Sequence, residues 1–151
     1  MSGLALKDFP CFADLTDDER DAFAEICQEL AVDAGEEVLV AGEEADGLVL
    51  LAAGRLRIES RGGEFAGTVG PGAALGALSL VAPGPREATA VATEACRVFW
   101  LPRTGFRRIA DDAPHAALRF LEHVLADLAA MVRPGLGHFL AAAVDPARAP
   151  E

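Results

Sequence analysis

The sequence has 151 residues, of which 52% are apolar, and it carries a formal net charge of −11 at pH 7. This length and apolar content predict one domain with a single hydrophobic core. The acidic balance argues against non-specific binding to nucleic acid or to anionic membranes, because both need a basic protein surface. The net negative charge repels anions, so an anionic ligand would need a local positive site on the protein.

The cysteines and the absence of targeting signals favour a cytoplasmic protein. Cys11, Cys27 and Cys96 are widely spaced, odd in number and without a CxxC pair. We therefore expect buried, reduced thiols in a cytosolic protein, not a disulfide framework. The N-terminus lacks the pattern of a signal peptide, and no apolar run reaches the length that spans a membrane.

The first predicted element is a helix that begins after Thr16. Thr16 and Glu19 have the spacing of a capping box, in which each side chain accepts the other residue's backbone N–H. Apolar residues then recur at helical spacing, at Phe23, Ile26, Cys27 and Leu30. The pattern therefore predicts that these four positions lie on one helix.

From Val32 to Leu101 the pattern changes to short apolar runs separated by glycine-rich turns. The runs predict strands over Glu37–Val40, Gly47–Ala52, Arg55–Ser60, Glu64–Val69, Ala88–Val91 and Cys96–Leu101. Several short strands at near-regular spacing predict an antiparallel sandwich or barrel instead of βαβ units.

Residues 75–92 read LGALSLVAPGPREATAVA and combine features that suit an anion. Gly76 lets backbone N–H groups approach a ligand, and the turn that follows it favours a negative charge. Arg86 arrives from the next strand and can bind phosphate or carboxylate with a charge-assisted fork. Taken alone, a single arginine is more often a surface residue paired with an acid.

After Leu101 the chain is predicted to be helical again. Thr104 is a candidate cap for a short helix over Gly105–Ala110, and Pro114 suits the first turn of a longer helix that ends near Arg133. Its apolar positions form a seam with alternating spacings of three and four, at Leu118, Leu121, Leu125, Leu128 and Val132. A twin helix or the protein's own sheets could cover this seam. We divide the chain into a domain over 1–133 and an Ala/Pro-rich tail over 134–151.

The 75–92 stretch resembles the phosphate-binding cassette of cyclic-nucleotide-binding domains, the sensor module of Crp/Fnr regulators. That cassette reads roughly Phe-Gly-Glu-Leu-Ala-Leu, then Pro-Arg-x-Ala-Thr, and its register fits here without a gap. The glycine spacing over residues 34–56 and 70–72 resembles the family's approach to the cassette. The resemblance extends from about residue 9 to residue 132.

The resemblance implies a mainly β fold: an antiparallel jelly-roll barrel, or double-stranded β-helix, with an N-terminal helix and a C-terminal helical lid. It implies a non-catalytic regulatory domain in which ligand capture repositions the C-terminal helix. The cyclic phosphate would be held by Arg86, with backbone N–H groups near Gly76 assisting. The ligand-binding residues implied by the resemblance are Gly76, Ala77, Leu78, Arg86, Glu87, Ala88 and Thr89.

Two residues depart from the family pattern and favour an alternative. Ala77 replaces the glutamate that holds the ribose hydroxyl, which should weaken cAMP or cGMP by roughly 10- to 100-fold. Glu87 follows the arginine, where a small or hydroxyl residue is usual in the family. If its carboxylate faced a phosphate, the repulsion would cost up to about 4 kcal/mol of binding free energy. Strand alternation could instead turn the Glu87 side chain to solvent. The ligand is then a weakly bound cyclic nucleotide or another small anion. Alternatively, the domain has lost its ligand and serves protein interaction or dimerisation.

Other function classes find little support. His115, His123 and His138 lie in the predicted helical region and tail, away from the strands, so we expect no metal and no catalysis. Crp/Fnr regulators carry a helix-turn-helix after the last helix, but fewer than twenty residues remain here, so we expect no direct DNA binding. We expect a homodimer through residues 113–133, in which the apolar seam pairs with its twin.

Overall fold

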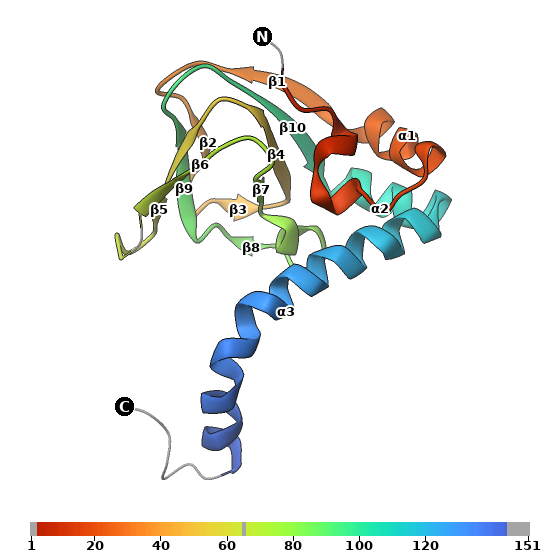
Figure 1. Cartoon of the computed structure of the whole chain (residues 1–151). Helices are drawn as coiled ribbons and strands as arrows, with labels where there is room; N and C mark the ends of the chain where they lie inside the picture. The colour runs from red at the N-terminus through yellow and green to blue at the C-terminus, as the bar shows by residue number, and fades with distance from the viewer. Residues whose placement is uncertain (1–2, 65, 145–151) are drawn as a thin grey trace.

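Two antiparallel sheets packed face to face form the body of the computed structural model, which describes residues 3–64 and 66–144 (Figure 1). In this part of the chain one sheet has the order β1-β10-β4-β7 and the other β2-β9-β5-β6, while β3 pairs with β8. The strands are β1 (Gln28–Val32), β2 (Glu37–Leu39), β3 (Glu44–Ala45), β4 (Gly47–Ala53), β5 (Leu56–Ser60), β6 (Ala66–Val69), β7 (Ala74–Leu75), β8 (Gly84–Pro85), β9 (Ala88–Ala92) and β10 (Cys96–Pro102).

Strand β4 is buried on both faces because it lies between two cores. Val49 and Leu51 pack with Leu56 and Val98 in the core between the sheets. The alternate residues of β4, such as Leu50, belong to a second core beneath the helices. Side chains of a strand alternate between its faces, so a strand covered on both faces is a continuous apolar run.

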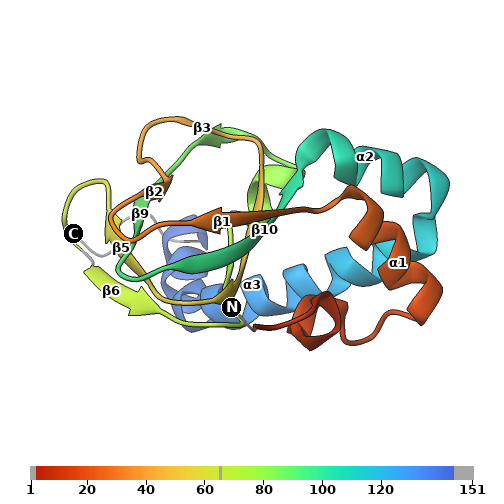
Figure 2. The same cartoon turned by 90° about the horizontal axis from the view of Figure 1, so that it is seen from above.

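The second core joins the helices to one end of the sheets (Figures 1 and 2). The helices are α1 (Asp17–Ile26), α2 (Arg103–Asp112) and α3 (Pro114–Val144), with short 3-10 turns η1 (Leu6–Asp8), η2 (Pro10–Phe12) and η3 (Ala77–Leu80). Phe120 of α3 lies in contact with Phe12, Phe23 and Phe106, at ring-centroid distances of 5.3–5.7 Å. This aromatic cluster fixes the first half of α3 to the body.

The six strands expected from the sequence are confirmed, with bounds that differ by one or two residues. The first helix also begins as expected, because Glu19 N–H donates to Thr16 Oγ1 at 3.2 Å and Thr16 N–H donates to Glu19 Oε1 at 2.9 Å. Its predicted extent is wrong, however. The helix ends at Ile26, and Leu30 lies in β1, opposite Val98 of β10.

Two expectations for the C-terminal helices are also wrong. Thr104 is not a cap, because α2 begins at Arg103 with Pro102 in the N-cap position. Helix α3 does not end near Arg133 but continues through Pro134 to Val144. A proline inside a helix removes one hydrogen bond and bends the axis without always ending it, and Figure 1 shows α3 changing direction in its second half.

Within residues 3–64 and 66–144, no helix combines the length and the apolar character that crossing a membrane requires.

Candidate functional site

Gly76 connects β7 to η3 and has a backbone that glycine alone adopts readily. Its φ of +85° lies in the left-handed region. A Cβ at this position would overlap Nη1 of Arg86 and would lie 2.9 Å from the carbonyl oxygen of Gly47. The guanidinium of Arg86 therefore lies directly over the Gly76 backbone, in space that a side chain would fill.

Arg86 follows β8 and is held there by its backbone. Its N–H donates to Glu43 O at 2.7 Å, and its carbonyl accepts the N–H of Gly42 at 2.9 Å. The residue is only 9% exposed, and Nη2 donates to Gly47 O at 3.3 Å. Burial lowers the pKa of the guanidinium, while the nearby charge of Asp46 acts in the opposite direction. Among the described residues, no carboxylate lies within ion-pair distance of Arg86.

Ser79 fixes η3 to the start of β4. Its hydroxyl lies 2.8 Å from Gly47 O and 2.6 Å from Gly76 O, and the residue is 4% exposed. A hydroxyl has one hydrogen to donate, so these two carbonyl groups already satisfy Ser79 as a donor. The carbonyl of Gly47 is thus shared between Ser79 and Arg86.

A cavity of about 660 Å³ opens beside this arrangement. Six of the seven ligand-binding residues expected from the sequence line it, namely Gly76, Ala77, Leu78, Arg86, Glu87 and Ala88. Thr89 does not line it, and its Oγ1 instead accepts the N–H of Ala41 at 3.0 Å. Glu87 is exposed at the cavity wall.

The helix α3 closes another side of the same cavity. Phe120, Val124, Asp127 and Leu128 line it from this helix, a contribution that the motif alone did not locate. The Asp127 side chain is 71% exposed and its Oδ2 lies 3.2 Å from Nε2 of His123. Among the described residues of the lining, Arg86 is the one cationic side chain. The cavity therefore combines a single buried positive charge with mostly apolar walls.

The predicted seam of α3 is divided between two environments. Leu121 packs against the core beneath the helices and Leu128 lines the cavity. Leu118 and Leu125 point away from the body, with 53% and 60% of their surface exposed. The side chain of Val132 lies outside the described residues. The body of the domain thus covers only part of the seam.

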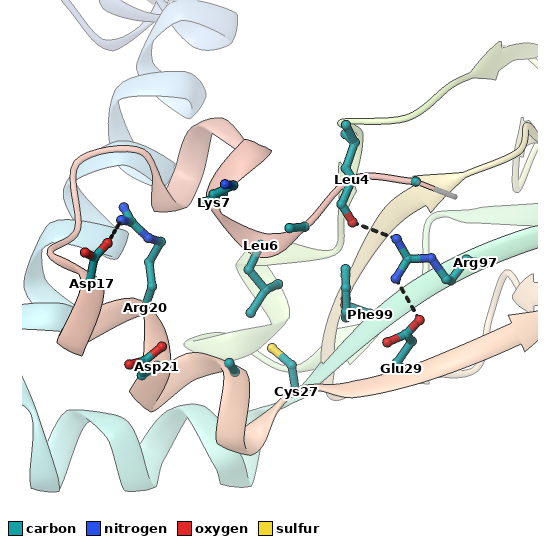
Figure 3. Close-up of a pocket in the computed structure, with 13 residues that line it drawn as sticks. Leu4, Leu6, Lys7, Asp17, Arg20, Asp21, Cys27, Glu29, Arg97 and Phe99 are labelled. Carbon is teal, nitrogen blue, oxygen red and sulfur yellow. Dashed lines mark hydrogen bonds and ion pairs between the residues drawn. The ribbon is translucent and has the colours of Figure 1, made fainter. Parts of the chain in front are cut away.

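A second cavity of about 630 Å³ lies between the N-terminal segment, α1 and β10 (Figure 3). Arg97 donates to Glu29 Oε1 at 2.7 Å and to Leu4 O at 2.8 Å, and Arg20 is paired with Asp17. Both guanidinium groups are thus neutralised within the protein. The arrangement holds the N-terminal segment in place. Lys7 also lines this cavity but is exposed, so the buried Arg86 is the better candidate for an external anion.

Within the described part of the chain, no group of three or more His, Cys, Asp or Glu side chains is placed to hold a metal ion.

Comparisons with known proteins identify the family of the domain. The family model for the cyclic nucleotide-binding domain matches residues 29–113. A cAMP-dependent protein kinase regulatory subunit from Yarrowia lipolytica is 32% identical over 104 residues, which are 69% of this chain. The chain spans 28% of the length of that relative.

Solved structures resemble the fold as well. The N-terminal domain of a transcriptional regulator from Streptomyces coelicolor A3(2) has a TM-score of 0.74 and 25% identity, over 85% of this chain and 93% of that one. A cyclic nucleotide-binding-like protein from Brucella abortus has a TM-score of 0.61 and 30% identity, over 71% of this chain and 95% of that one.

Proposed function

Because the chain belongs to the cyclic nucleotide-binding domain family, we propose that it is a non-catalytic regulatory domain that binds a small anion at Arg86. The observation that carries the proposal is the buried guanidinium over Gly76, which has no carboxylate partner among the described residues. A buried cation without a partner is costly, and an anion that binds it recovers part of that cost. Ligand binding would act on α3, because this helix forms one wall of the cavity.

Cyclic nucleotides should bind this site weakly. Ala77 has no group that can accept a hydrogen bond from a ribose hydroxyl, and Ser79 already donates its one proton to backbone carbonyl groups. We expect dissociation constants for cAMP and cGMP in the high-micromolar range or weaker, from the roughly 10- to 100-fold loss that the missing carboxylate implies. Isothermal titration calorimetry tests this, and a sub-micromolar constant for either nucleotide would contradict it. The double substitution Ala77→Glu with Glu87→Thr should tighten binding.

The proposed architecture is a jelly-roll barrel. Its support is the strand order β1-β10-β4-β7 and β2-β9-β5-β6, in which most pairs join strands distant in sequence and β5-β6 alone among these pairs joins neighbours. All described strand pairs are antiparallel. This order is the one produced when a long hairpin of paired strands folds over into two sheets.

A second candidate function is dimerisation or protein interaction without a ligand. The exposed leucines Leu118 and Leu125 favour it, because they lie seven residues apart on α3, at equivalent positions of a heptad. We propose a homodimer through residues 113–133. Light scattering of the wild type beside Leu125→Glu tests this: conversion of a dimer into a folded monomer supports it, and a wild type that is monomeric at tens of micromolar contradicts it.

We also propose that the chain does not bind DNA directly. The support is its net charge of −11, which opposes the release of counterions that drives protein–DNA association. A mobility-shift experiment with duplex DNA at low salt is the sensitive test, because phosphate attraction is strongest there. A salt-dependent shift at micromolar protein would contradict the proposal.

A further inference from the structure

We propose that the ligand at Arg86 is an amphiphilic monoanion, with one acidic group at the guanidinium and an apolar body that carries no sugar hydroxyls. This inference rests on the proposed function, because it takes Arg86 as the anion-binding group. It names the class of ligand that the rest of the cavity fits.

The first argument is the character of the cavity walls. Aliphatic and aromatic side chains enter the lining from both sheets and from α3, among them Leu48, Ile58, Leu75, Phe120 and Val124. A volume of about 660 Å³ lies within the range of sites for small organic ligands. Apolar walls of this kind stabilise an apolar ligand by removing its surface from water.

The second argument is the distribution of charge. In the described part of the lining, Arg86 is the one cation and is buried, whereas the carboxylates of Glu87, at the wall, and Asp127, beside His123, are exposed. The bond from Nη2 to Gly47 O is long at 3.3 Å, so a carboxylate can replace or share it with a shorter, charge-assisted bond. The positive charge thus lies at one place in the cavity, and the ligand needs one negative group to match it.

The third argument is the small number of buried partners for hydroxyl groups near Arg86. Close to Arg86 the side chains are Ala77, which is apolar, and Ser79, which is engaged by the carbonyl groups of Gly47 and Gly76. Near Arg86 a sugar could still donate to the oxygen of Ser79, but the carboxylates of Glu87 and Asp127 are exposed, so some of its hydroxyl groups would be buried without hydrogen bonds, which lowers affinity. A hydrocarbon body avoids this loss, and each buried methylene increases affinity by up to roughly fourfold.

The experiment is isothermal titration calorimetry with hexanoate, octanoate, hexan-1-ol and cAMP, below the concentration at which octanoate forms micelles. The proteins are the wild type, Arg86→Gln and the control Arg57→Gln, whose exposed side chain lies on β5 beside Glu59. We expect octanoate to bind more tightly than hexanoate, and hexanoate at least about tenfold more tightly than hexan-1-ol. Arg86→Gln should lose at least about tenfold in octanoate affinity, and Arg57→Gln should keep the wild-type value.

The outcomes separate this inference from the proposed function. If the wild type binds cAMP more tightly than octanoate and Arg86→Gln loses the cAMP binding, the proposed class of ligand is wrong, but the proposed anion site is supported. Equal affinity for hexanoate and hexan-1-ol also overturns the inference, and this comparison needs only the wild type if Arg86→Gln fails to fold. If no anion in the set binds, the inference is wrong, and the proposed anion site is wrong as well if cGMP and inorganic phosphate also fail to bind.

Discussion

The substitution Gly76→Ala tests the contact between the cassette backbone and Arg86. A residue with a Cβ at a φ of +85° costs roughly 1–2 kcal/mol through backbone strain alone. The new Cβ would also overlap Nη1 of Arg86 and lie 2.9 Å from Gly47 O, so the guanidinium or the first residue of β4 must move. Overpacking of this kind typically costs about 1–3 kcal/mol. We expect Gly76→Ala to lower the free energy of unfolding by roughly 2–5 kcal/mol.

The matched control is Gly35→Ala. Gly35 has a φ of +90°, but a Cβ there would have no atom within 4 Å. This variant should therefore lose only the strain contribution of roughly 1–2 kcal/mol. Equilibrium unfolding in urea, followed by circular dichroism, measures both values.

Anion binding provides the second readout of the same pair. Gly76→Ala should weaken binding because it displaces the guanidinium, whereas Gly35→Ala should leave binding unchanged. If the two variants lose equal stability and both bind like the wild type, the guanidinium of Arg86 does not lie over Gly76.

Two further predictions concern the helices and the thiols. Thr16→Ala removes a helix cap and should lower the free energy of unfolding in urea by about 1 kcal/mol. The control Thr104→Ala, inside the first turn of α2, should change that free energy by less than about 0.5 kcal/mol. Equal losses in the two variants would contradict the assigned caps. Burial raises the pKa of the Cys11 and Cys27 thiols to about 12, so both should react slowly with iodoacetamide at pH 8 and rapidly in urea, as mass spectrometry can determine. Rapid labelling of Cys11 in the native protein at pH 8 would contradict this account. Because these pKa values are raised in the folded state, the free energy of unfolding should fall as pH rises from about 9 towards 12.

Local patterns predicted much of the fold. The unbroken apolar run of β4 and the capping box before α1 could be recognised because each depends on neighbours in sequence. The assignment of Leu30 to the first helix failed because its spacing from Ile26 fits a helix, while the residue is held in β1 by pairing with Val98, far along the chain. At Pro134 the error was the reverse. The proline predicted that the last helix ends near Arg133, but α3 continues through it to Val144.

For the candidate site, the sequence indicated most of the lining residues but not the contacts between them. The resemblance pointed to Gly76 and Arg86, and both line one cavity, but the role of the Gly47 carbonyl depends on a contact across 39 positions. Thr89 was expected at the ligand, yet its hydroxyl accepts a backbone N–H from Ala41, 48 positions away. Spacing in the sequence does not reveal whether a polar side chain binds a ligand or forms a hydrogen bond with a distant part of the backbone.

The central claim is that Arg86 holds an anionic ligand, and the most direct test is a comparison of anion binding by the wild type, Arg86→Gln and Arg57→Gln. Calorimetric titration with cAMP, cGMP, inorganic phosphate and octanoate measures the affinity of each protein under one set of conditions. The account predicts that at least one of these anions binds the wild type and Arg57→Gln equally and binds Arg86→Gln at least about tenfold more weakly. Equal binding by folded Arg86→Gln, or no binding of any of these anions by the wild type, would contradict it.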